Sequence, residues 1–365
     1  MTKAELDSIK ILPLDNSWYR KVKEKLDGIA KPLDGLGKFE YLIAQIGAIA
    51  KTTKISIQKK AVLVMCADNG VVEEQVSQSG KEVTLAVAKA MGVNNSSVGK
   101  MAAVAGVDVI PVDIGIDTDE VIPGVLPRKV AKGTKNFAKE PAMTEEEVLK
   151  AIETGIQLVQ QCHREGYEIL ATGEMGIGNT TTSTAVAAAL LDLEVEQVTG
   201  KGAGLTDEAL KRKCRVIEEA IEKYSLRDAD AFTILKTVGG LDIAGLTGVF
   251  IGAAIEQIPV VIDGVISAVA ALLAETLCKG AVNYMIPSHK SRELAETAIM
   301  KKLHLDPVLD ADMALGEGTG AVMMMSLLDV ALGVYLQGAS FANFEIEQYL
   351  SLIHISEPTR RTPIS

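Results

Sequence analysis

The chain has 365 residues, of which 48% are hydrophobic and 23% are charged, and its formal net charge is −11. This composition is globular and excludes global disorder, and the length allows one large domain or two ordinary ones. An acidic chain with 4% aromatic residues offers few cations for phosphates and few rings for bases, so we expect no nucleic-acid partner.

Neither a membrane segment nor a metal-binding cysteine cluster is expected. The N-terminal residues contain no apolar signal region, and the most apolar stretch, 241–277, is interrupted by Glu256, Pro259 and Asp263. The four cysteines are far apart and form no CxxC pair. We therefore expect reduced thiols in the cytoplasm and no structural zinc.

Along the chain, two helices are predicted first, at 17–28 and 38–51, joined by the turn-rich segment 32–37. Short apolar runs then predict buried strands at 61–66, 107–112, 168–171, 232–237 and 259–262. Longer segments with helical spacing lie between them, at 145–161 and 207–223 among others. The alternation predicts an α/β fold with a mostly parallel sheet and flanking helices, which is Rossmann-like.

Polar residues follow several of these strands. Asp68, in an Asp-Asn-Gly sequence, comes after the first strand, and Asp263 comes after the last one. Open α/β sheets bind ligands at the carboxyl ends of their strands, so both are candidate site residues. The alternative for each is ordinary turn chemistry.

The strongest signal is the segment GEMGIGNTTT, which starts at Gly173 and leads from a strand into an Ala-rich helix. Glycines there let backbone N–H groups approach an anion, and a helix N-terminus adds favourable partial charge. The alternative is a tight turn that binds nothing. Glu174 would repel a phosphate, so we expect it to hold a ribose hydroxyl instead.

Three further segments are candidates. GKGAG at 200–204 precedes a basic cluster at 211–213, for which the alternative is a solvated helix face. His289, among polar residues at 288–291, could equally be a structural histidine. The segment LGEGTGA, starting at Leu315, places Glu317 between glycines, where partial burial would raise its pKa and make it a better base. The alternative for Glu317 is helix capping.

The last predicted helix is 321–336. We expect residues 1–55 with 321–349 to form a small helical domain and residues 56–320 to form the large α/β domain. Residues 350–360 read LSLIHISEPTR, which resembles a translated sequencing-library adapter. We expect 350–365 to be a non-native tail, with the natural sequence departing after about Tyr349; the alternative is a genuine polar tail.

Taken in order, the motifs ADNGVV, VDIGI, GEMGIGNTTT, GKGAGL, GGLDIAGLTG, PVVIDG, IPSH and LGEGTGA make the chain resemble the nicotinate-nucleotide:dimethylbenzimidazole phosphoribosyltransferase family. The resemblance covers about Pro32 to Tyr349. It implies a large α/β domain, a small helical domain from both chain ends, and a homodimer. It also implies nicotinate mononucleotide and a benzimidazole-type base as substrates, with no cofactor and no metal.

The resemblance also implies roles for individual residues. Glu317 would be the general base that takes the proton of the incoming base. The nucleotide and its phosphate would be bound by Glu174, Gly176, Ile177, Gly178, Asn179, Thr180, Gly202, Lys213, Asp263 and Ser291. The base pocket would be shaped by Asp68, Gln75, Ser77, Ser79 and Leu315.

The sequence departs from the family pattern around the base pocket. Asn69, Gly80 and Val87 stand where many or some members have His, Pro and Gln. The natural lower-ligand base is therefore open, and adenine, a phenol or a simpler benzimidazole are alternatives. A catalytically silent nucleotide-binding homologue is a further alternative, but such a protein would be expected to lose Glu317.

Overall fold

The computed structural model describes residues 1–200 and 204–347, so Gly202 and the segment 350–365 lie outside the described residues. Two compact units make up the chain. Unit 1 consists of Met1–Pro13 and Ile57–Ser326, and unit 2 consists of Leu14–Ser56 and the residues from 327 onward. Residues 1–13 and 321–326, which the sequence analysis assigned to the small domain, belong to unit 1 here.

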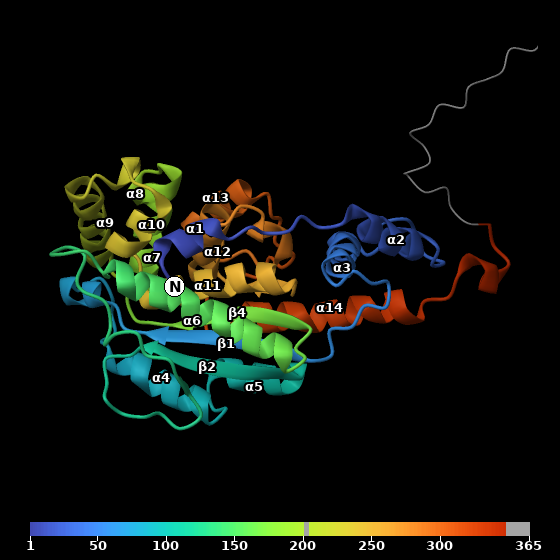
Figure 1. Ribbon diagram of the computed structural model, residues 1–365, viewed down its shortest axis with the longest axis horizontal. Helices are drawn as coiled ribbons and strands as arrows, with labels where there is room; N and C mark the ends of the chain where they lie inside the picture. Colours follow the sequence, from blue (N-terminus) through green and yellow to red (C-terminus); the bar gives the residue numbers. More distant parts are fainter. Residues whose placement is uncertain (201–203, 348–365) are drawn as a thin grey trace, which may run out of the picture. The chain divides into compact units, whose positions relative to one another are not determined.

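Unit 1 contains a six-stranded sheet (Figure 1). Its strands are β1 (Lys60–Ala67), β2 (Val107–Gly115), β3 (Leu126–Pro127), β4 (Ile169–Met175), β5 (Val260–Ile262) and β6 (Met285–Pro287). The helices that begin in this unit are α1 (Lys3–Ser8), α4 (Glu82–Gly92), α5 (Ser97–Ala105), α6 (Glu145–Arg164), α7 (Asn179–Leu191), α8 (Val195–Val198), α9 (Asp207–Lys223), α10 (Ala231–Val238), α11 (Leu241–Glu256), α12 (Val265–Leu277), α13 (Leu294–Leu303) and α14 (Thr319–Gln337).

The strand order is β3-β2-β1-β4-β5-β6, and every neighbouring pair is parallel. This is the doubly wound order in which the chain direction across the sheet reverses between β1 and β4. Ligands bind beside such a reversal, at the carboxyl ends of the strands. The predicted fold class, a mostly parallel Rossmann-like sheet, is confirmed.

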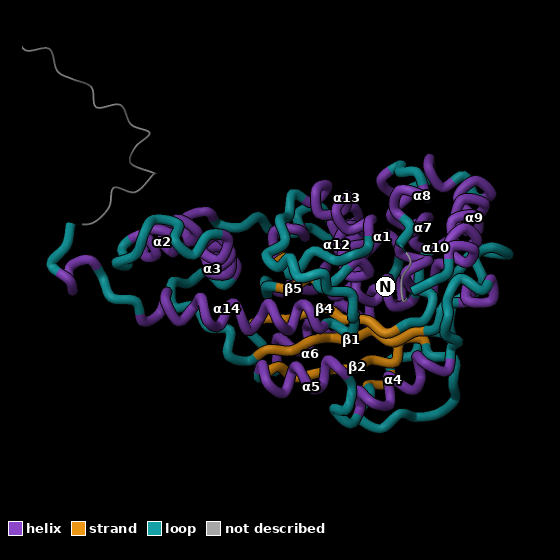
Figure 2. Tube along the Cα trace, turned by 180° about the vertical axis from the view of Figure 1, so that it is seen from behind, coloured by secondary structure: helices purple, strands orange, loops and turns teal. Residues whose placement is uncertain are grey.

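Helices cover both faces of the sheet, as the burial of all eight β1 residues requires (Figure 2). Helix α11 packs on the face that carries Met65, and the loop leading into α14 packs on the opposite face at Val62. Helix α6 packs closely on α11 in turn. A Cβ at Gly155 would lie 2.1 Å from the Gly245 carbonyl oxygen, so this contact between two helix backbones requires glycine.

Four of the five predicted strands are confirmed as β1, β2, β4 and β5, and the predicted helices at 145–161 and 207–223 are confirmed as α6 and α9. Helix α6 begins with a capping box. The Thr144 N–H donates to Glu147 Oε2 at 2.7 Å, and the Glu147 N–H donates to Thr144 Oγ1 at 3.2 Å.

The predicted strand at 232–237 is wrong, because these residues form helix α10. Asp230 caps this helix by accepting hydrogen bonds from the N–H groups of Phe232 and Thr233, at 2.9 and 3.0 Å. The buried apolar residues also recur at helical spacing, and a short apolar run alone does not distinguish a strand from a buried helix. Asp230 was the available signal for a helix start.

Unit 2 contains α2 (Asn16–Asp27), α3 (Lys38–Ile49) and the later part of α14, which confirms the helices predicted at both chain ends. The Tyr335 hydroxyl donates to the Thr53 carbonyl at 2.8 Å and so ties the two chain segments of this unit together. By length and composition α14 could cross a membrane, and 56% of the window that qualifies is buried inside the structure. A buried core helix passes the same test.

Candidate functional site

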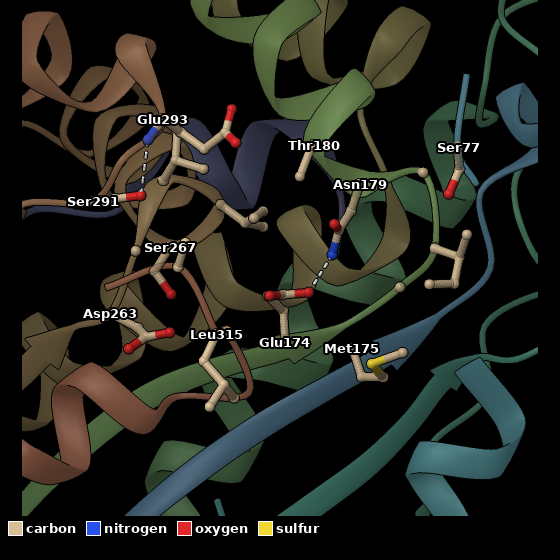
Figure 3. Close-up of a pocket in the computed structure, with 18 of the residues that line it drawn as sticks. Ser77, Glu174, Met175, Asn179, Thr180, Asp263, Ser267, Ser291, Glu293 and Leu315 are labelled. Carbon is tan, nitrogen blue, oxygen red and sulfur yellow. Dashed lines mark hydrogen bonds between the residues drawn. The ribbon is translucent and has the colours of Figure 1, made fainter. Parts of the chain in front are cut away.

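A cavity of about 240 Å³ lies at the carboxyl ends of β4, β5 and β6, beside the reversal in strand order (Figure 3). Its walls come from the segment after β4, the start of α12, the loop after β6, residues 76–78 and residues 314–316. All of these belong to unit 1. The site therefore lies where a doubly wound sheet is expected to bind a ligand.

One wall of the cavity is acidic. Glu174, near the end of β4, points between Leu315 and Asn179 (Figure 3). The Asn179 side-chain amide donates to Glu174 Oε2 and, at 3.1 Å, to Asp242 Oδ2. One neutral amide thus joins two buried carboxyls from β4 and α11.

The pKa of each of these carboxyls is raised above its usual range. Burial, reinforced by the negative charge of Asp242, raises the pKa of Glu174 to about 8. Burial likewise raises the pKa of Asp242 to about 6. A group with a pKa near neutrality is suited to exchanging protons, and buried uncompensated carboxyls also attract a cationic ligand.

The adjoining part of the wall is suited to an anion. Helix α7 begins at Asn179, directly after Gly178 in a left-handed conformation (φ +93°), so the N-terminal turn of the helix faces the cavity. Behind Thr180 lies the fully buried Lys213, whose Nζ donates to Thr180 Oγ1 at 3.0 Å and to the Gly200 carbonyl at 3.4 Å. Burial lowers the pKa of Lys213 to about 8, although the Glu293 carboxylate opposes this effect.

A third wall contains Asp263, directly after β5. Its Oδ2 accepts the Gly318 N–H at 3.2 Å and its Oδ1 accepts the Ala321 N–H at 3.0 Å. His289 lies beside it, with Nδ1 2.9 Å from the Ser288 hydroxyl. Burial raises the pKa of Asp263, and the neighbouring His289 opposes this shift.

Glu317 stands next to this wall but does not line the cavity in the described structure. Its Oε2 accepts the N–H of Val98, in the first turn of α5, at 3.0 Å. The backbone of Glu317 has φ +60°, between Gly316 at +84° and Gly318 at +91°. The half-buried carboxylate thus caps a helix, while Leu315 and Gly316 of the same loop line the cavity; its role as a base stays a prediction.

A phosphoribosyltransferase family model matches residues 11–346. The nicotinate-nucleotide--dimethylbenzimidazole phosphoribosyltransferase of Clostridium acetobutylicum is 44% identical over 339 residues, which cover 93% of this chain and 96% of that protein. The enzyme of the same name from Acetivibrio thermocellus is 45% identical over 328 residues, covering 90% and 93%. The crystal structure of CobT from Thermus thermophilus matches with a TM-score of 0.86 at 34% identity, covering 91% of this chain and all of that one.

The chain belongs to this phosphoribosyltransferase family. The resemblance drawn from the motifs is therefore confirmed.

Most residues that the resemblance assigned to this family's site do line the cavity. They are Ser77, Glu174, Gly176, Ile177, Gly178, Asn179, Thr180, Asp263, Ser291 and Leu315. Others lie outside the lining. Lys213 lies behind Thr180, the buried Asp68 accepts the Asp117 N–H at 2.8 Å, Gln75 accepts from Arg212 at 3.0 Å, and Ser79 donates its N–H to Ser77 at 3.3 Å. Gly202 is not among the described residues.

The structure adds Asp242 and Ser267, which were not candidates in the sequence, and it places the candidate His289 in the cavity lining. Asp242 lies in the motif GGLDIAGLTG, which was quoted only for the family resemblance. His289 lines the cavity, which was one of the two interpretations left open. Ser267, in the first turn of α12, lines it with a buried hydroxyl that has no hydrogen-bond partner within the described chain (Figure 3). Its only signal in sequence was its position shortly after Asp263.

Proposed function

We propose that this protein transfers the phosphoribosyl group of nicotinate mononucleotide to 5,6-dimethylbenzimidazole. The products are α-ribazole 5′-phosphate and nicotinate, of which the first serves the assembly of the cobalamin nucleotide loop. The names of the relatives in the family support this activity. Sequence and fold agree along nearly the whole chain, so the proposal extends to the complete reaction.

The observation that carries the proposal is that buried carboxyls and a helix N-terminus occur together at this cavity. Nicotinate mononucleotide has a positively charged pyridinium ring at one end of its ribose and a phosphate at the other. The buried carboxyls of Glu174 and Asp242 suit the ring, because a nearby positive charge would offset the free-energy cost of burying their negative charges. The first turn of α7, with Lys213 behind it, suits the phosphate.

The reaction breaks the bond between C1′ and the pyridinium nitrogen, and the electron pair leaves with nicotinate as a neutral ring nitrogen. An azole nitrogen attacks C1′ from the opposite face, which inverts the β-riboside to the α-riboside. The azole then loses its N–H proton, and Glu317 is the proposed base. Positioning of two reactants can supply roughly 7–11 kcal/mol, and a general base typically 10²–10⁴-fold.

Glu317 must exchange partners to act in this way. Its hydrogen bond to Val98 uses Oε2, and the carboxylate has a second oxygen. Because Leu315 and Gly316 of the same loop line the cavity, a side-chain rotation would bring the carboxylate toward a bound base. Ser267, with its unpartnered hydroxyl, is a further proposed substrate contact.

The test is a product assay. Purified protein is incubated with nicotinate mononucleotide and a panel of bases that includes dimethylbenzimidazole, benzimidazole, adenine and a phenol, and riboside phosphates are identified by mass. We expect α-ribazole 5′-phosphate. A product formed only with another base would assign the specificity to that base. The panel is needed because Asn69, Gly80 and Val87 depart from the family pattern around the base pocket. Release of no nicotinate with any base would refute the proposal.

We expect no metal requirement, since the leaving group departs as a neutral ring and needs no Lewis acid. Turnover should be unchanged after treatment with a chelator, and loss of turnover that Mg²⁺ or Zn²⁺ restores would contradict this.

We further propose a cytoplasmic homodimer. Light scattering on the eluting protein should give twice the chain mass, and a monomeric active species would contradict the dimer.

A further inference from the structure

We propose that Asp263 is a positioning residue that acts through Glu317, by holding residues 316–321 in the conformation that presents this carboxylate. The inference rests on the proposed function, because the role of Glu317 as base belongs to it. The resemblance instead implies that Asp263 contacts the nucleotide.

The first observation is how the Asp263 carboxylate is used. It is buried at the end of β5, and its two oxygens accept the backbone N–H groups of Gly318 and Ala321, at 3.2 and 3.0 Å. These donors lie on both sides of the start of α14, where N–H groups have no partner within the helix. Asp263 therefore acts as the cap of α14, supplied from a different strand, and its charge also suits the positive end of the helix.

The second observation is the conformation of the loop. Gly316, Glu317 and Gly318 are consecutive and all have positive φ, between +60° and +91°. Glycine adopts such angles readily, but glutamate does so at a cost, and a residue of this kind persists only when its surroundings determine it. The N–H groups that bond Asp263 lie one and four residues after Glu317, and they fix the exit of this strained segment.

The third observation is that contacts on other sides leave the loop little freedom. A Cβ on Gly173 of β4 would lie 2.5 Å from the Glu317 carbonyl oxygen, so the two backbones are in close contact. The Glu317 side chain is bonded to the Val98 N–H on α5. With the backbone fixed by β4 and by Asp263, rotation of the side chain is the movement left to Glu317.

The experiment is a double-mutant cycle. Asp263→Asn keeps the shape of the side chain, but its amide group must face one of the two N–H donors, so one bond is lost. Acting alone, this variant should lower kcat by about 10²-fold with the KM for nicotinate mononucleotide changed less than about twofold. In a Glu317→Gln background the same change should lower kcat by less than about twofold further, because the two residues act as a unit.

Amide hydrogen exchange supplies a readout that does not depend on turnover. Asp263→Asn should increase exchange at Gly318 and Ala321 without increasing it in β1 or β4. Asp310→Asn is the matched control, since it removes an exposed carboxylate shortly before the same loop. It should leave kcat and exchange unchanged.

Each outcome decides something. A raised KM with unchanged kcat would overturn the inference, as would a double variant whose loss of kcat equals the product of the two single losses. Asp263 would then be a residue that contacts the nucleotide. Wild-type protein that releases no nicotinate would refute the proposed function instead. If Asp263→Asn fails to fold, Gly318→Ala tests the same loop, because its Cβ would lie 2.6 Å from Val62 Cγ2 and φ is +91°. Normal kcat in Gly318→Ala would show that the loop conformation does not govern turnover, which also overturns the inference.

Discussion

Two groups of buried carboxylates, one in each unit, differ in what surrounds them. In unit 2, Lys23 Nζ lies 3.1 Å from Asp27, 2.5 Å from Asp34 and 2.7 Å from Glu40, and Lys31 bonds Glu40 at 2.5 Å. In unit 1, the partner that Glu174 and Asp242 share is the neutral amide of Asn179.

The pKa values follow this difference in partners. Burial would raise the pKa of Glu40, but the bonds from Lys23 and Lys31 outweigh it and hold the pKa below its usual range. Burial dominates at Glu174 and raises its pKa. The carboxylates of unit 2 lie within 4.8 Å of one another, as metal ligands would, yet Lys23 already supplies the positive charge. We infer that the unit 2 group stabilises the fold, whereas the unit 1 group is prepared for a ligand.

The comparison also predicts opposite responses to pH. Glu40, with a lowered pKa, contributes stability above its ordinary pKa of 4.5, and this contribution is lost on acidification through the lowered value. Glu174, with a raised pKa, contributes its full stability below pH 4.5, where its carboxyl is neutral in the folded and unfolded states. This contribution is lost as the pH rises toward 8. Acidification therefore lowers the stability contributed by the unit 2 group and raises the stability contributed by the unit 1 group.

The largest expected effect comes from breaking the compensated group. Lys23→Met should lower the free energy of unfolding of unit 2 by about 3–5 kcal/mol, because it leaves buried carboxylates without their cation. The single tryptophan, Trp18, lies in α2, so its fluorescence reports on this unit during urea unfolding. Lys54→Met, at an exposed lysine of the same unit, is the control. Equal urea midpoints for the two variants would show that the cluster does not stabilise unit 2.

The next effect concerns turnover at the prepared site. Glu317→Gln should lower kcat by about 10²-fold or more while binding of nicotinate mononucleotide stays nearly intact, as for a general base. Steady-state kinetics and calorimetric titration measure the two quantities. Glu140→Gln, at an exposed position, should change neither. Near-normal turnover of the Glu317 variant would exclude it as the base and direct attention to Glu174.

A pH-dependent effect should sharpen the contrast between the two groups. Glu174→Gln cannot ionise, so its stability relative to wild type should rise between pH 4.5 and 8, by up to about 1.4 kcal/mol per pH unit. Chemical denaturation at several pH values, followed by circular dichroism, measures this slope. A difference that does not change with pH would mean that Glu174 has an ordinary pKa.

The smallest effect is expected from a change outside both groups. Deletion of residues 350–365, the adapter-like sequence, should change stability by no more than about 0.5 kcal/mol and leave turnover unchanged. Melting temperature and product formation provide the measurements. A clear fall in either would show that the tail belongs to the working protein.

Much of this architecture could be predicted from local sequence. The strands β1 and β5 are apolar on both faces, which is a property of the segment itself, and the glycine-rich turn before α7 indicates a close backbone approach. Residues 232–237 could not be assigned from apolar character alone. Their helical state is set by Asp230 and by packing, and packing is not a local property.

The site shows the same limit. The roles of Asp242 and of Asn179 as a bridge depend on α7 and α11 meeting beside β4, which no spacing in the sequence encodes. The direction of the Glu317 side chain depends on a positive φ and on the N–H of Val98, far away in the chain. Sequence identified which residues are chemically capable, whereas the tertiary contacts determine which way they point.

The strand order has a consequence for synthesis on the ribosome. The central strand β1 pairs with β4, which is made about a hundred residues later, and the cavity draws on residues from Val76 to Gly316. At 5–20 residues per second, this span takes roughly 10–50 s to emerge. Until β4 emerges, one edge of a strand that is apolar after Lys60 has no neighbour, which favours aggregation. Nascent chains of this protein should therefore depend on chaperone protection until β4 is available, and the binding site should form only near the end of translation.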